Sequence, residues 1–287
     1  YGSVNFGLST FDTVVTGCSG GNTCLTGTSA LVPAACSPSG PYVLSPTNCT
    51  GYSACTAGSN GGLIRVPLLD GSGNPASAST LLSWVDGDCG TSTEIPAYGG
   101  TPLAKSINWV KQYFTTSADG FATPLKPTDP GCRPINLILL TDGVPDTCDS
   151  GSAATNAQSL FNGVTVGGKT FSVHTYVVGL GSEVDPTALD DIARMGQCGS
   201  TSPLAACPSA TNANRKVGDV KAILASNESG MAAAFAQIVA DAIRPESCNN
   251  ADDNCNGCVD EGYPHYYNTR NDCCSSARAT CLANYAL

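Results

Sequence analysis

Two parts of the sequence carry oxygen-bearing side chains at spacings that suit a divalent cation. The first is LILLTDG, residues 137–143, in which an apolar run ends at Asp142. The second is CNNADDNCNGCVDEG, residues 248–262, near the end of the chain. Carboxylate, amide and backbone oxygens are the ligands that Mg²⁺ and Ca²⁺ prefer, so both segments are candidate metal sites.

The apolar residues before Asp142 predict a strand at 135–141 that is buried on both faces, as in a parallel sheet covered by helices. Ligands of open α/β sheets bind at the carboxyl ends of the strands, and Asp142 stands at that end. The alternative is that Asp142 only forms the turn before Gly143.

Strands and helices alternate along the chain, which favours the α/β class. Strand patterns lie at 4–11, 62–69, 135–141, 171–181 and 220–226. Helix patterns lie at 77–85, 101–114, 152–162, 185–193 and 231–243. Two of these helices begin with Thr101-Pro102 and Asp185-Pro186, so we expect Thr101 and Asp185 to be N-caps with proline in the first helical position.

Composition narrows the function. The net charge is −10 with only 13 Lys and Arg residues, so the chain has no basic surface for nucleic acid or an anionic membrane. Charged residues make up only 13%, which suits an exported protein, and no segment is apolar enough to span a bilayer. The chain starts at Tyr1, so we expect that something upstream was removed. It contains no GxSxG, Walker, GxGxxG or HExxH motif, and we expect no enzyme.

The 16 cysteines are scattered along the chain, which favours disulfides and a secreted or cell-surface location. Five of them lie in an irregular insertion at 13–61. Cys198 and Cys207 are close enough in sequence to close a small loop. The tail at 246–287 holds six more and is expected to be a separate small module that needs crosslinks or metal.

Five segments in this order resemble the von Willebrand factor type A domain over about residues 1–244: FGLSTF (6–11), GGTPL (99–103), LILLTDG (137–143), HTYVVGLG (174–181) and DPTALDDIA (185–193). The resemblance implies a doubly wound, mostly parallel sheet for residues 1–245. It also implies a metal-ion-dependent adhesion site at the carboxyl edge, where Thr101 and Asp142 match two ligands of Mg²⁺ or Mn²⁺. The other interpretation of Thr101 is a helix N-cap alone.

The chain departs from this family at the start. The DxSxS motif and the first strand that precedes it are absent, and neither DCGTST (88–93) nor DSGS (149–152) replaces them. In the family's strand order, 3-2-1-4-5-6, that first strand is central. Its loss would leave the strands at 4–11 and 135–141 with unpaired edges about 10 Å apart. We therefore expect the strand to come from an upstream fragment, from a cleaved piece that stays bound, or from a neighbouring subunit.

The tail reproduces the D-x-N-x-N-G start of a calcium loop, although not the full EF-hand spacing. The expected Ca²⁺ ligands are Asp252, Asn254, Asn256, the Cys258 carbonyl, and Asp260 or Glu261. The segment is similar to a short cysteine-bracketed metal-binding repeat of predicted bacterial surface proteins, in which Cys248 and Cys255 would form a pair. The alternative is a disulfide-stapled acidic turn without metal.

The sequence thus predicts an adhesion or ligand-binding protein of the cell surface whose bound metal ligates an acidic group of a protein partner. The alternative is a structural subunit of an extracellular filament or surface assembly, in which another polypeptide supplies the missing strand. A hydrolase is a distant third hypothesis.

Overall fold

The structure, a computed structural model, describes residues 5–11, 14–18, 49–53, 61–70, 72–85, 101–129, 133–145, 149, 151–199 and 220–242. The chain folds into two compact units. Unit 1 comprises Tyr1–Val4, Pro127–Asp142 and Ala157–Leu287, and unit 2 comprises Asn5–Lys126 and Gly143–Asn156.

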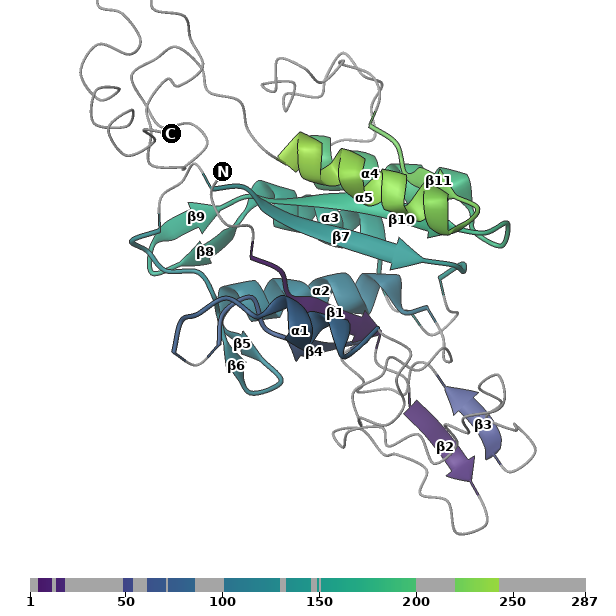
Figure 1. Cartoon of the computed structure of the whole chain (residues 1–287), viewed down its shortest axis with the longest axis horizontal. Helices are drawn as coiled ribbons and strands as arrows, with labels where there is room; N and C mark the ends of the chain where they lie inside the picture. The colour runs from purple at the N-terminus through teal and green to yellow at the C-terminus, as the bar shows by residue number, and fades with distance from the viewer. Residues whose placement is uncertain are drawn as a thin grey trace, which may run out of the picture. The chain divides into compact units, whose positions relative to one another are not determined.

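Unit 1 contains a parallel sheet (Figure 1). In spatial order its strands are β11 (Ile223–Ala225), β10 (Val173–Leu180) and β7 (Ile135–Thr141). β10 pairs in parallel with both neighbours, with Val173 opposite Ile135 and Val178 opposite Ile223. Parallel neighbours need crossover connections, and helices supply them here, so the predicted α/β class is confirmed.

Helices cover both faces of this sheet. They are α4 (Pro186–Cys198) and α5 (Glu228–Ala242). Successive side chains of β10 point to opposite faces. On one face α4 approaches closely, since a Cβ on Gly196 would lie 2.5 Å from the Cβ of Thr175. On the other face Ile238 of α5 packs against Tyr176.

A helix and a hairpin precede β10. They are α3 (Ala153–Asn162), β8 (Val164–Val166) and β9 (Lys169–Phe171). The hairpin turns at Gly167 and Gly168, whose φ angles of 55° and 85° are favourable for glycine. We expected a single strand at 171–181, but Phe171 ends the hairpin and β10 starts at Val173.

β7 is an edge strand of the described sheet, and it is less buried than β10. Six of the eight residues of β10 are buried. In β7 only Leu139 and Thr141 are buried, and Leu140 is 37% exposed. The expectation that 135–141 is buried on both faces is therefore wrong in part, because β7 pairs with β10 on one side and with no other described strand.

Unit 2 combines a strand pair with a helix. Its main elements are β1 (Leu8–Phe11), β4 (Gly62–Val66) and α2 (Leu103–Thr115), and β1 and β4 are antiparallel. α2 packs on this pair and buries Ile107, Val110 and Phe114 along one face, as the apolar spacing predicts.

Five shorter elements complete the described part of unit 2. They are β2 (Val14–Cys18), β3 (Cys49–Ser53), α1 (Ala78–Leu82), β5 (Ser117–Ala118) and β6 (Phe121–Ala122). β2 and β3 lie within the predicted insertion and pair antiparallel, with Cys18 opposite Cys49. The tail at 246–287 lies outside the described residues.

Side chains close the outer edge of β4. The Asp119 carboxylate accepts hydrogen bonds from the Ile64 backbone N–H at 2.7 Å and from the Trp109 indole N–H at 2.8 Å. Just beyond β4, the Leu68 N–H donates to the Tyr113 hydroxyl at 3.0 Å. Burial raises the pKa of Tyr113, so this hydroxyl stays neutral at physiological pH. The Ile64 and Leu68 N–H groups therefore have side-chain partners.

Replacing Thr175 with Val is expected to stabilise the chain by about 1 kcal/mol. Thr175 has no exposed surface, and its Oγ1 has no hydrogen-bond partner within the described part of the chain. A methyl group of the same shape removes the cost of a desolvated hydroxyl. The free energy of unfolding in urea measures the effect.

The matched control is Thr123→Val. Thr123 Oγ1 donates to the Phe114 carbonyl at 2.6 Å and accepts from the Leu125 N–H at 3.2 Å, so its loss should destabilise by about 1 kcal/mol. Equal destabilisation by both substitutions would contradict the prediction for Thr175.

Candidate functional site

Thr101 precedes α2 without serving as its N-cap. Pro102 occupies the N-cap position, no side chain of that residue caps the helix, and helix α2 begins at Leu103. The Leu103 N–H donates to the Thr101 backbone carbonyl at 2.9 Å. The prediction of Thr101 as N-cap and Pro102 as first helical residue is therefore wrong, because another residue supplies the cap.

That residue is Asp149. Its carboxylate oxygens accept the Ala104 N–H at 2.7 Å and the Lys105 N–H at 3.0 Å. The same region adds a second contact, since the Asn156 side-chain amide donates to the Ala104 carbonyl at 2.6 Å. An aspartate at a helix N-terminus satisfies free N–H groups and complements the helix dipole. Asp149 and Asn156 therefore both contact the first turn of α2.

The Thr101 hydroxyl lies against the backbone of Gly143. A Cβ on Gly143 would stand 3.0 Å from Thr101 Oγ1, so any larger residue would press on the hydroxyl. Gly143 directly follows Asp142 in the chain. Thr101, one predicted metal ligand, therefore lies beside Gly143, which directly follows the other predicted ligand, Asp142.

Asp142 follows the last residue of β7 and is exposed to solvent. An exposed carboxylate and a threonine hydroxyl are both hard oxygen donors, so their chemistry fits Mg²⁺ or Mn²⁺. Two donors supply only part of an octahedral shell of about six oxygens. No cluster of three or more His, Cys, Asp or Glu side chains suited to a metal is found in the portion of the chain that the structure describes.

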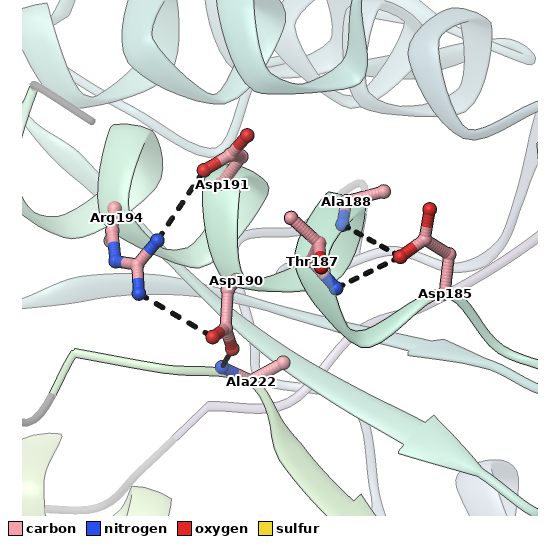
Figure 2. A network of polar contacts seen from close by, with 7 residues as sticks. All are labelled: Asp185, Thr187, Ala188, Asp190, Asp191, Arg194 and Ala222. Carbon is pink, nitrogen blue, oxygen red and sulfur yellow. Dashed lines mark hydrogen bonds and ion pairs between the residues drawn. The ribbon is translucent and has the colours of Figure 1, made fainter.

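The acidic residues of α4 have structural partners (Figure 2). Asp185 is the N-cap that the sequence predicts, and its carboxylate accepts the N–H groups of Thr187 at 2.9 Å and Ala188 at 3.3 Å. Asp190 accepts the Ala222 N–H at 3.0 Å and lies 3.4 Å from Arg194. The hydrogen bond from Ala222 to Asp190 joins the segment before β11 to α4. The carboxylates of Asp185 and Asp190 therefore stabilise the fold.

The turn at residues 70–74 also uses its carboxylate internally. Asp70 accepts the backbone N–H groups of Ser72 and Asn74, each at 2.8 Å, and the Asn74 side-chain amide at 3.2 Å. The hydrogen bonds from Asn74 are the main cause of the lowered pKa of Asp70. The Asp70 carboxylate therefore serves to stabilise this exposed turn through hydrogen bonds within it.

Several predicted site residues fall outside the described residues. They are Asp252, Asn254, Asn256, Cys258, Asp260 and Glu261 of the calcium loop, and the cysteines Cys207, Cys248 and Cys255. Cys198 is described and is disulfide-bonded. His174 is half-buried and meets Phe161 edge-on, with ring centroids 5.4 Å apart.

Sequence reasoning missed the roles of Asp149 and Asp119. The partners of Asp149 lie 44 and 45 residues away, and no local pattern marks such a contact. For Asp119, the sequence does contain a signal of a turn. The Asp119-Gly120 pair is a hairpin turn sequence, and Asp119 has a φ of 52° in the β5–β6 turn.

Comparison of the chain with known protein families, curated proteins and solved structures finds no match in any of the three. Within the described residues, no helix is both long and apolar enough to cross a membrane.

Replacing Asp149 with Ala is expected to destabilise the chain by about 1–2 kcal/mol, because α2 loses its side-chain cap. The amides of Ala104 and Lys105 should also exchange their hydrogens faster. Urea unfolding and residue-resolved hydrogen exchange measure the two effects.

Asp191→Ala is the control, since it removes a carboxylate of α4 that lies 3.4 Å from Arg194 and is 44% exposed. It should change stability by at most about 0.5 kcal/mol. Unchanged exchange at Ala104 in Asp149→Ala would show that Asp149 is not the cap.

Proposed function

We propose that the chain is a secreted or cell-surface ligand-binding protein that holds a divalent cation with Asp142 and Thr101 and presents it to an acidic group of a protein partner. The order of its sequence segments, together with the helices on both faces of its parallel sheet, supports a doubly wound fold of the von Willebrand factor type A kind. The disulfide at Cys198 supports export to an oxidising compartment.

One observation carries this proposal. Thr101 Oγ1 lies beside Gly143, the residue that follows Asp142, while Asp149 caps α2 in place of Thr101. A hydroxyl that is released from helix capping suits a metal ligand better than a capping group does. Gly143 leaves room for this hydroxyl, because a Cβ at that position would approach it to 3.0 Å.

The two proposed metal ligands differ in charge. Asp142 supplies a negative oxygen from an exposed position at the carboxyl end of β7, and Thr101 supplies a neutral one. The other positions of a Mg²⁺ shell would be taken by water, by further donors and by the partner's carboxylate. Exchangeable positions of this kind allow reversible binding of a partner.

The chain is expected to bind Mn²⁺ weakly, with a Kd on the order of 10⁻³ M, because two protein ligands are few for this cation. Mn²⁺ electron paramagnetic resonance measures free and bound ion directly. In a chain whose tail site is removed by Asp252→Ala, Asp142→Ala should abolish Mn²⁺ binding and Thr101→Val should weaken it. Thr101→Ser keeps the hydroxyl and should bind as the chain with Thr101 does.

Asp191→Asn is the matched control, since it neutralises a carboxylate of α4 distant in sequence from both ligands and should leave Mn²⁺ affinity unchanged. Equal loss of affinity in Asp191→Asn and Asp142→Ala would mean that Mn²⁺ responds to net charge alone. Mn²⁺ binding that survives Asp142→Ala in the chain with Asp252→Ala would overturn the proposed site.

For the tail we propose a separate Ca²⁺ site at Asp252, Asn254, Asn256, the Cys258 carbonyl, and Asp260 or Glu261, supported by the spacing of oxygen donors in the sequence. Isothermal titration of the full chain with Ca²⁺ should give a binding event that Asp252→Ala removes and Asp142→Ala leaves intact. No heat of binding in the unmodified chain would favour an acidic turn without metal.

A further inference from the structure

Two antiparallel strand pairs follow one another along the same two segments of unit 2 (Figure 1). β1 pairs with β4, and the last pair of that ladder is Phe11 with Gly62. Farther along the same segments, β2 pairs with β3, beginning with Val14 opposite Ser53. The chain therefore enters the predicted insertion at 13–61 on one strand and leaves it on the antiparallel partner of that strand.

The register of the β2–β3 pair brings two cysteines together. Cys18, the last residue of β2, lies directly opposite Cys49, the first residue of β3. The pairs from Val14 opposite Ser53 onward keep one register, in which each step forward along β2 is matched by one step back along β3. No bulge therefore displaces one cysteine from the other.

The backbone spacing of such a pair suits a disulfide. Directly opposite residues of an antiparallel pair have Cα atoms about 4.5 Å apart, or about 5.5 Å apart where they exchange backbone hydrogen bonds. Disulfides join residues whose Cα atoms lie about 4.4–6.8 Å apart. Both kinds of antiparallel pair fall within this range, so either one allows Cys18 and Cys49 to be linked without moving the backbone.

The β2–β3 pair also needs a constraint on its register. In hairpins the register is commonly fixed by a short turn, but here residues 19–48 separate the two strands. Among the described strands, β2 and β3 pair only with each other, and a two-stranded pair alone is marginally stable. A covalent link at the last pair of the ladder would hold this register.

We propose that Cys18 and Cys49 form an interstrand disulfide that closes residues 19–48 into a covalent loop. The two thiols give up two electrons and two protons as the S–S bond forms. A small-molecule disulfide such as oxidised glutathione takes them up, and its own S–S bond is broken to give two thiols. The link assigns a pairing that the sequence leaves open, and it does not depend on the proposed cation site.

The disulfide also limits how the remaining cysteines of the insertion can pair. The insertion holds five cysteines, so three remain after Cys18 and Cys49 are joined. Cys24 and Cys36 lie within the closed loop in sequence, and Cys55 lies outside it. Because three is an odd number, at least one of them pairs outside the insertion or stays a thiol.

The test is a peptide map of the full chain, purified under oxidising conditions, treated with an alkylating agent to block free thiols, and digested with chymotrypsin without reduction. Cleavage after aromatic residues and leucine gives one peptide, 12–25, with Cys18 and Cys24, and another, 45–52, with Cys49. Mass spectrometry should find these two peptides joined. Fragmentation between Cys18 and Cys24 should place the link at Cys18, and reduction should separate the peptides.

Cys24→Ser is the matched control, because it removes the other cysteine of the same peptide and should leave the link intact. Cys18→Ser should make Cys49 reactive toward the alkylating agent. The map of the unmodified chain decides the question even where a variant folds poorly. The proposal is overturned if Cys49 of that chain is alkylated, or if it is linked to Cys24, Cys36, Cys55 or a cysteine outside the insertion.

Discussion

The backbone pairing of β7 is the constraint on which the rest of unit 1 depends. β7 is joined to β10 over all seven residues, from Ile135 opposite Val173 to Thr141 opposite Gly179. This ladder fixes the direction of the sheet and sets Asp142 at its carboxyl end. The same strand is only half-buried, because it has a single neighbour among the described strands.

In unit 2 the corresponding constraint is the capping of helix α2. Its cap comes from Asp149, far along the chain, and this frees the Thr101 hydroxyl to lie beside Gly143. A cap supplied by a distant residue couples two segments that local sequence would leave independent. The arrangement of the candidate ligand therefore depends on tertiary contacts and not on the local helix signal at Thr101-Pro102.

Much of the fold could be predicted from periodicity. The strand at 135–141 and the helices after Pro102 and Asp185 appear where apolar spacing and capping residues place them. Asp185 was predicted as an N-cap because its partners, Thr187 and Ala188, are two and three residues away. The role of Asp149 was not predictable in this way, since the contact is made only after the chain folds. The exposure of Leu140 was not predicted, because a hydrophobic pattern indicates that a strand is apolar but does not show which neighbours cover it.

The candidate site, too, was predicted in part from the sequence and in part only from the structure. Sequence singled out Thr101 and Asp142, and the structure adds Gly143 and Asp149 as the residues that determine how Thr101 is held. The calcium loop at 252–261 depends on sequence spacing alone, because those residues lie outside the described part of the chain.

Among the described strands, β7 is an apolar strand that pairs with β10 alone. Residue-resolved hydrogen exchange of the chain alone measures it most directly, because amides paired within a sheet exchange far more slowly than amides open to water. We expect slow exchange throughout β10. In β7 we expect slow amides that bond to β10 to alternate with amides on the other side that exchange at least about tenfold faster. Uniformly slow exchange along β7, equal to that of β10, would contradict this expectation, because another part of the chain would then already pair with this edge.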